Sequence, residues 1–132
     1  MWRSIKPLTS LQLRQFETTF QFNIQPDMRE FLLAHNAGIP SSATFPTKSK
    51  EWNMVRLLDF SDSCSTKGAW AINKRLKDKV GDKRIIIGID RIGNYICLER
   101  HYRHQDIVVW VHHIEQFEPS LLDIPTLLRC IS

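Results

Sequence analysis

The sequence has no apolar run long enough to cross a membrane. Its longest apolar stretches, RIIIGI and DIVVWV, fall far short of the roughly 20 residues that a membrane helix needs. Residues 1–12 lack the continuous apolar core of a secretory signal peptide. Cysteine is scarce and forms no CxxC pair, and the three residues are Cys64, Cys97 and Cys130. An odd number of widely spaced cysteines is typical of free thiols in a reducing compartment, so we expect a cytoplasmic protein without a membrane segment.

Short motifs of the familiar catalytic classes are also absent. The chain has no GxSxG, HExxH, P-loop or GxGxxG sequence. Gly88 and Gly93 fall in a predicted hairpin rather than between a strand and a helix, which argues against a phosphate-binding loop. The carboxylates that could serve as acids or bases are scattered: Asp59, Asp90, Glu99 and Asp106. No general acid/base pair is recognisable among them, so the sequence predicts no catalytic residues and no enzyme.

What is present suits one ordinary globular domain. The chain has 132 residues, of which 42% are hydrophobic and 24% are charged, so it can bury a core without disulfides or a structural metal. We therefore expect a single domain over residues 1–132. The formal net charge of +4 is mildly basic, which is too little by itself to indicate a nucleic-acid-binding protein.

Two amphipathic helices are predicted in the first forty residues. Thr9 and Gln12 have the spacing of a capping box, and apolar residues at helical spacing follow them. Pro26 suits the first turn of the second helix, which stops in NAGIP (36–40).

The NAGIP turn has the residues of a helix stop. Gly38 is expected to take the left-handed conformation after the last turn, and Pro40 prevents the helix from continuing. On this hypothesis Gly38→Ala costs about 1 kcal/mol or more through its positive φ. Asn36, Gly38 and Pro40 are therefore predicted to be structural turn residues rather than ligand contacts.

A third amphipathic helix is predicted over residues 69–80. Ser65 or Thr66 can serve as its N-cap, and Gly81 is its expected stop. A short last helix is predicted over residues 124–131, with Pro125 in its first turn.

Four strands are predicted, at residues 53–60, 84–90, 94–100 and 106–112, because they are rich in β-branched and aromatic residues. Gly93 lies in the short connection between the second and third strands, where it can take a positive φ. The element order is ααβαβββα. We therefore expect an α+β fold, with a mostly antiparallel sheet of about four to six strands and helices packed on one face.

A cluster of possible metal ligands or nucleophiles lies in the second half of the chain. Its members are Cys97, His101, His104, His112 and His113. A metal site needs three or four ligands that converge on one point, whereas Cys97 lies within a strand and His112 and His113 point to opposite sides of another. Cys64 precedes a helix, which can lower a thiol pKa, but no partner base is evident. The sequence predicts no metal and no cofactor, and leaves a small metal-dependent or cysteine enzyme as an alternative.

A basic stretch runs from Lys67 to Arg84, along the predicted third helix and past its end. Its members are Lys67, Lys74, Arg75, Lys77, Lys79, Lys83 and Arg84. The functional hypothesis is a surface that contacts phosphates. No interleaved aromatic residue or base-reading motif accompanies the run, which favours the solvated back of an amphipathic helix and makes nucleic acid an unlikely partner.

The last predicted strand has two different sides. One side is wholly apolar and fits the core, while the other carries Trp110 and His112, next to Tyr95 on the preceding strand. If that side is partly exposed, Trp110 and Tyr95 are suitable anchors for a partner. The alternative is that a loop or the C-terminal segment covers it.

The motifs in this order resemble the SMI1/KNR4 superfamily, also called SUKH. A proline and an acidic residue open a helix that ends in an Asn-Gly-Gly-like turn, as in QPDMREFLLAHNAGIP (25–40). A strand ending in an aromatic residue follows, as in VRLLDF (55–60), and then a hairpin, as in IIIGIDRIGNYICLE (85–99). A tryptophan strand, IVVWVHH (107–113), and a closing helix, IPTLLRCI (124–131), complete the pattern. Ala37 and Ile92 depart from it, since each stands where the first glycine of a turn is usual.

The resemblance implies a protein-binding module rather than an enzyme. Bacterial members of this superfamily look like immunity proteins that bind a cognate toxin, often a nuclease or a deaminase, and block it without catalysis. Eukaryotic relatives look like regulatory scaffolds, and the family has no shared catalytic residues to carry over. With the sheet side described above, the resemblance implies this set of partner-binding residues: Asp90, Asn94, Tyr95, Trp110 and His112.

Overall fold

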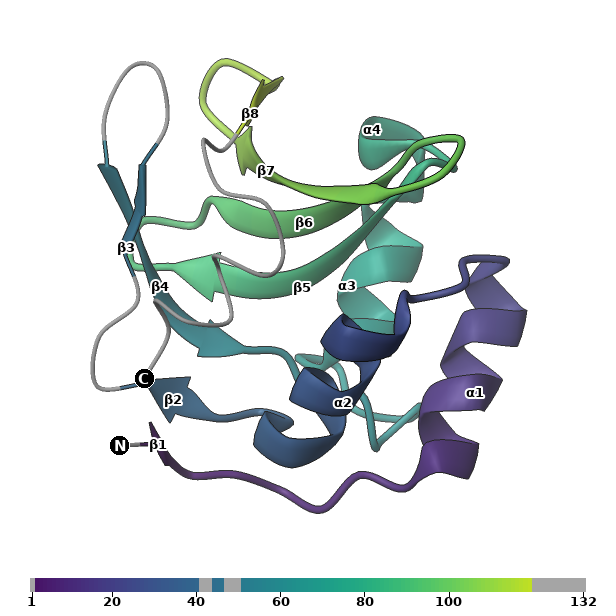
Figure 1. The fold of residues 1–132 in the computed structure, drawn as a ribbon. Coiled ribbons are helices and arrows are strands. Elements are labelled where there is room, and N and C mark those ends of the chain that lie inside the picture. Colours follow the sequence, from purple (N-terminus) through teal and green to yellow (C-terminus); the bar gives the residue numbers. More distant parts are fainter. Residues whose placement is uncertain (1, 41–43, 47–50, 120–132) are drawn as a thin grey trace.

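The computed structural model describes residues 2–40, 44–46 and 51–119 (Figure 1). The helices are α1 (Ser10–Phe20), α2 (Pro26–His35), α3 (Ala69–Arg75) and α4 (Lys77–Val80). The strands are β1 (Trp2–Arg3), β2 (Ile39–Pro40), β3 (Thr44–Pro46), β4 (Glu51–Leu57), β5 (Arg84–Asp90), β6 (Tyr95–Arg100), β7 (Gln105–Val111) and β8 (Gln116–Pro119).

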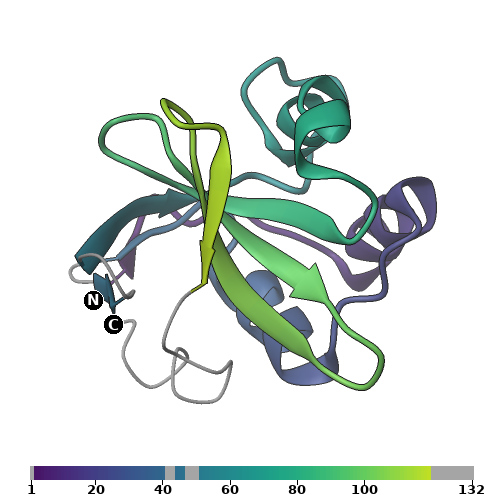
Figure 2. The same ribbon diagram turned by 90° about the horizontal axis from the view of Figure 1, so that it is seen from above.

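Six of the strands form one antiparallel sheet, in the order β3-β4-β5-β6-β7-β8, and β1 pairs with β2 in a separate two-stranded sheet. The predicted α+β class with a mostly antiparallel sheet is therefore confirmed. Seen from above, the sheet is strongly twisted, so that β8 runs across the direction of β5 (Figure 2). The turns β5–β6 and β7–β8 lie at one end of the sheet, and the β6–β7 hairpin tip lies at the other.

The first two helices begin where the sequence predicts. The Thr9 hydroxyl accepts a hydrogen bond from the Gln12 amide, and the Gln12 side chain accepts one from the Thr9 amide, which completes the capping box. Pro26 occupies the first turn of α2. Arg29 of α2 forms an ion pair with the buried Glu17 of α1, with a distance of 2.7 Å between nitrogen and oxygen. This pair ties the two helices together.

The third helix differs from the prediction at its start. It begins after Gly68 without any side-chain cap, because the Ala69 amide donates to the Asp59 carbonyl at 2.9 Å. The prediction that Ser65 or Thr66 caps it is therefore wrong. The helix is also interrupted at Leu76, which separates α3 from α4. The predicted stop at residue 81, a glycine with φ of 81°, is confirmed.

The long strands agree with the predicted ones to within a few residues. β5 has the predicted bounds and β7 is shifted by one residue, whereas β4 ends at Leu57 and leaves residues 58–60 outside the strand. The short strands β1, β2, β3 and β8 were not predicted, because two to four residues are too few for a periodic pattern. The predicted helix over residues 124–131 lies outside the described residues.

The core joins the helices to the sheet through an aromatic cluster. The Phe16 ring of α1, fully buried, lies 4.8 Å from the ring of Phe60 and 5.5 Å from that of Trp70 of α3. The indole nitrogen of Trp70 donates to the Phe60 carbonyl at 3.1 Å, so this large side chain is buried with its polar atom satisfied. All five residues from Ile107 to Val111 of β7 are buried, so both sides of that strand are covered.

The NAGIP turn stops α2 by a different route from the predicted one. Ala37, not Gly38, takes the left-handed conformation, with φ of 61°. The prediction that Gly38 has a positive φ is wrong. Gly38 is needed for close packing instead, because a Cβ there would lie 2.7 Å from the His35 carbonyl oxygen and 2.7 Å from the Trp2 ring. Both contacts are too short for any side chain to be accommodated without movement.

Gly38→Ala is therefore expected to lower the free energy of unfolding by about 1–3 kcal/mol, through overpacking rather than backbone strain. The matched variant Ala37→Gly relieves a left-handed alanine but removes a buried methyl group, so its change is expected to stay within about 1 kcal/mol. Urea unfolding of both variants measures the difference. Equal losses in the two variants, or an unchanged midpoint for Gly38→Ala, would contradict the packing explanation.

Asn36 makes the same turn into a junction between three segments. Its side-chain oxygen accepts from the Phe60 amide at 2.8 Å, and its side-chain nitrogen donates to the Asp59 carboxylate at 2.9 Å. That nitrogen also lies 3.3 Å from the Lys6 carbonyl, and the Asn36 carbonyl accepts from the Lys6 amide at 2.9 Å. Asn36 is fully buried, so the predicted structural role of this turn rests on these hydrogen bonds as well as on the stop.

Candidate functional site

The β5–β6 turn is held by a buried carboxylate. Asp90, 7% exposed, accepts hydrogen bonds through Oδ1 from the amides of Ile92, at 3.0 Å, and of Asn94, at 2.8 Å. Its Oδ2 accepts from the Asn94 side-chain nitrogen at 2.9 Å. Gly93, with φ of 92°, supplies the left-handed residue that the turn requires, as predicted. The turn is therefore fixed from inside by its own polar side chains.

The same network reaches the segment after β7. The Asn94 side-chain oxygen accepts from the His112 amide at 3.0 Å and lies 2.8 Å from Nδ1 of the His112 ring. That ring also faces Gly93, where a Cβ would lie 3.7 Å from it. His112 is exposed although its ring is anchored. An exposed side chain that is held in one orientation loses little conformational freedom when a partner binds.

Trp110 and Tyr95 lie on the sheet side for which the sequence leaves exposure and burial open. They are paired across strands β6 and β7, and Trp110 is only 5% exposed, with its ring 4.8 Å from that of Phe117 in β8. Tyr95 is half-buried. Of the two alternatives left open for this side, the structure shows that Trp110 is covered, because strand β8 brings an aromatic ring against it.

The exposed side chains at this end of the sheet include two isoleucines that the predicted set of contact residues lacks. Ile92 in the β5–β6 turn is 57% exposed, and Ile114 in the β7–β8 turn is 52% exposed. We call the following group the turn-end surface: Arg91, Ile92, His112, His113 and Ile114, all of them exposed. An isoleucine inside a polar turn is the signal that could have identified this surface.

The opposite end of the sheet carries the β6–β7 hairpin tip. Tyr102 at this tip is 92% exposed, and the Arg103 guanidinium lies 5.3 Å from its ring centroid. Open hollows of about 560 Å³ and about 360 Å³ lie beside the tip. His101 lines both of them, so this tip is the second prominent surface among the described residues.

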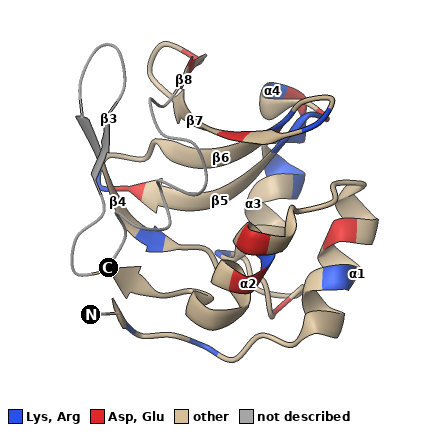
Figure 3. Ribbon diagram, viewed as in Figure 1, with Lys and Arg blue, Asp and Glu red and all other residues tan. Residues whose placement is uncertain are grey.

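The basic stretch forms part of a third surface, on α3, α4 and the start of β5 (Figure 3). Three of its seven cations have carboxylate partners. Lys77 lies 3.4 Å from Asp82, Lys79 pairs with Glu115, and Arg84 lies 2.6 Å from Glu99. The Arg84 guanidinium also stacks 3.8 Å from the Phe117 ring centroid. These pairs favour the solvated helix face over a phosphate-binding surface.

The two described thiols fit no nucleophilic site. Burial raises the pKa of the Cys97 thiol well above its ordinary value, against weaker lowering by the Arg84 charge. A protonated, buried thiol is a poor nucleophile and a poor metal ligand. Cys64 is exposed, and its amide donates to the Asp62 carboxylate at 2.8 Å in a local turn. Cys130 lies outside the described residues.

The comparison with protein families identifies the fold. The family model SUKH_6, described as SMI1-KNR4 cell-wall, matches residues 10–121. The chain belongs to the SMI1/KNR4 (SUKH) family. Domains of this family are of the immunity-protein type and are generally non-catalytic. No curated protein and no solved structure matches the chain.

The match extends through the elements that build the turn-end surface. Residues 10–121 include both helices before the NAGIP turn and all of β4 to β8.

Within the part of the chain that is described, no helix is long and apolar enough to cross a membrane.

Proposed function

We propose that this protein is an immunity protein, which binds a cognate toxin and neutralises it without catalysing a reaction. The observation that carries the proposal is membership of the SMI1/KNR4 (SUKH) family over residues 10–121. A binder of this kind needs a rigid, exposed surface rather than a reactive group. The turn-end surface has these properties, since the turn beneath it is fixed by the buried pair Asp90 and Asn94.

Ile92 and His112 are the proposed central contacts. Ile92 offers apolar area on a turn that is already ordered, so little conformational entropy is lost on binding. His112 presents an anchored ring beside it. Three of the other residues predicted to contact the partner are buried: Asp90, Asn94 and Trp110. We propose that they stabilise the turn-end surface without contacting the partner. The half-buried Tyr95 is proposed to support Trp110, its partner across the strands.

The charge of the protein indicates what kind of toxin surface it fits. The net charge is +4, and Arg91 adds a cation to the turn-end surface. Complementarity between charged surfaces favours a neutral or acidic partner face over a basic one. A toxin with a nuclease or deaminase domain is therefore proposed to present such a face to this protein, away from any basic nucleic-acid groove.

The proposal is tested by co-purification with the product of the adjacent gene. The wild-type protein is expected to bind that product, and Ile92→Glu is expected to weaken the affinity at least tenfold, as for a central contact residue. Leu11→Glu is the matched control, because Leu11 is a similarly exposed apolar residue on α1, remote from the turn.

Two results would count against the proposal. If no neighbouring gene product binds the wild-type protein, the immunity role fails. If the product binds but Leu11→Glu weakens binding as much as Ile92→Glu does, the turn-end surface is not the contact.

A further inference from the structure

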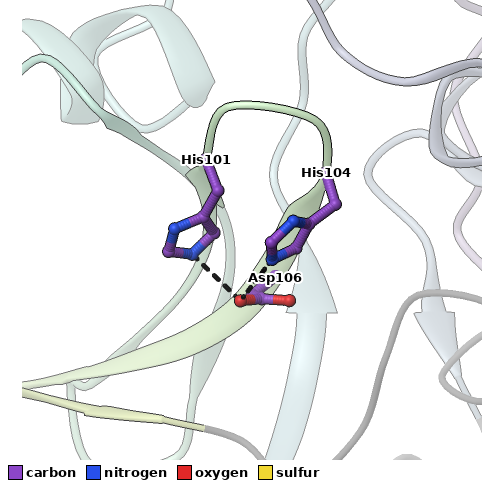
Figure 4. Close-up of side chains that lie close together, drawn as sticks. All are labelled: His101, His104 and Asp106. Atoms are coloured by element: carbon purple, nitrogen blue, oxygen red, sulfur yellow. Dashed lines mark ion pairs between the residues drawn. The ribbon is translucent and has the colours of Figure 1, made fainter.

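The β6–β7 hairpin tip brings two imidazoles and a carboxylate to one point (Figure 4). His101 and His104 flank the tip, and Asp106 follows in β7. Nε2 of His101 lies 2.9 Å from Oδ2 of Asp106, and Nε2 of His104 lies 3.4 Å from the same oxygen. All three ligand atoms lie within 4.8 Å of one another.

We propose that these three residues form a binding site for a divalent transition-metal ion of the Zn²⁺ type. Metal–ligand distances of about 2.0–2.2 Å place the ligands of a tetrahedral site about 3.3 Å apart. Two of the separations at the hairpin tip are already close to that value. The third closes by a small rotation of an exposed side chain, because both histidines lie at the surface.

The backbone holds the ligands in register before any metal binds. The His101 amide donates to the His104 carbonyl at 2.8 Å, which closes the turn. Glu99 and Asp106 are direct partners across strands β6 and β7, so the strand register fixes the position of Asp106 next to the hairpin tip. The two imidazole rings stack with centroids 4.6 Å apart and planes inclined by 16°, and both direct Nε2 at the same carboxylate.

The donor set decides which ions the site takes. Two imidazoles with one carboxylate suit Zn²⁺, Cu²⁺, Ni²⁺ or Co²⁺, whereas Ca²⁺ and Mg²⁺ prefer oxygen ligands throughout. Three protein ligands leave a fourth tetrahedral position open for water or for a group from a partner. Glu99 Oε1 also lies 3.1 Å from Nε2 of His101, so this contact is given up when that nitrogen binds the metal.

The sequence alone predicts no metal because it pairs the histidines with the wrong third ligand. Cys97 is buried within β6 and does not reach the tip. Asp106 counted only as one of several scattered acids, and the cross-strand register is what brings it to the histidines. The site lies at the opposite end of the sheet from the turn-end surface. The test of metal binding is therefore independent of the test of the proposed function.

The test is a titration of the whole chain with Zn²⁺, followed by the long-range proton–nitrogen NMR spectrum of the histidine rings. One equivalent of Zn²⁺ is expected to shift Nε2 of His101 and His104 while His112 and His113 stay unchanged. Calorimetry is expected to give one site, which Mg²⁺ does not fill. The variants His101→Gln/His104→Gln and Asp106→Asn are expected to lose at least tenfold in Zn²⁺ affinity.

The matched control is His112→Gln/His113→Gln, which removes the same number of exposed histidines elsewhere and is expected to bind Zn²⁺ as the wild type does. Thermal unfolding in a chelator checks that every variant is folded. The competing account is that the two imidazoles only hydrogen-bond to Asp106 and hold no metal. The proposal is therefore overturned if Zn²⁺ leaves the two rings unshifted, or if the hairpin variants bind it as tightly as the control.

Discussion

Replacing Asn36 with alanine is expected to lower the free energy of unfolding by about 3 kcal/mol, because each buried polar group left without a partner costs about 1–3 kcal/mol. The variant leaves the buried Phe60 amide without its acceptor and removes the donor to Asp59. The water that could replace these contacts has little access, since Asn36 is fully buried. Denaturant unfolding measures the loss.

The control for this variant is Asn23→Ala, because Asn23 is an exposed asparagine near the start of α2. Its change is expected to stay within about 0.5 kcal/mol, as for ordinary surface substitutions. A similar loss in the two variants would mean that the junction contributes nothing special. An unchanged stability of Asn36→Ala would contradict the importance assigned to its hydrogen bonds.

The same variant changes how stability depends on pH. Burial alone would raise the pKa of Asp59, but hydrogen bonds from Ser61 and Asn36, with the charge of Lys6, outweigh it and hold the pKa below its ordinary value. A carboxyl whose pKa is lowered by folding stabilises the protein above its unfolded pKa, and this contribution is lost as the pH falls through the folded value. Without Asn36, the loss of stability below about pH 4 is therefore expected to be smaller than in the wild type.

Replacing Asp90 with alanine is the second large change, with an expected loss of about 3 kcal/mol, because it leaves the Ile92 and Asn94 amides without acceptors. Asp90→Asn keeps one acceptor but places a donor against the Asn94 side-chain nitrogen, so about half of that loss is expected. Binding to the partner is expected to weaken at least tenfold in Asp90→Ala, because Ile92 loses its fixed position.

Two further variants separate stability from binding at this turn. Asp78→Ala removes an exposed carboxylate from α4 and is expected to change neither property. His112→Ala removes an exposed ring but leaves the hydrogen bond between Asn94 and Asp90 intact. It is therefore expected to weaken partner binding more than it lowers the free energy of unfolding. If Asp90→Ala unfolds at the wild-type midpoint, the buried carboxylate does not fix the turn.

The sequence predicts the fold well where a pattern extends over many residues. β5, β6 and β7 have six or seven residues each, long enough for β-branched side chains to mark a strand. The capping box of Thr9 and Gln12 also marks a helix start through a local pairing that needs no tertiary information.

The errors arise where tertiary contacts decide the outcome. Gly38 was assigned a positive φ because glycine favours it, but the tight contact with Trp2, which is far away in sequence, is what requires a glycine there. The left-handed position then falls to Ala37, one residue earlier. Whether Trp110 is exposed or covered stays open from the sequence because β8, which supplies Phe117, is too short to be recognised.

The candidate sites show the same division. Through Asp90, Asn94 and His112 the sequence points to the same end of the sheet as the proposed turn-end surface, but Asp90 and Asn94 are buried beneath that surface. Which of a turn's residues face outward depends on the hydrogen bonds inside it. The grouping of Asp106 with two histidines likewise needs the register between β6 and β7, which the sequence does not specify.

The central claim, that the protein neutralises a toxin by binding it, is tested most directly by titrating the toxic activity of the adjacent gene product with this protein. A binder without catalysis is expected to abolish the activity at a fixed stoichiometric ratio, with the Leu11→Glu control equal to the wild type and Ile92→Glu shifted to higher concentration. Neutralisation by a small fraction of one equivalent would reveal an enzyme, and no neutralisation at any ratio would reveal a protein of another function. Either result would contradict the account.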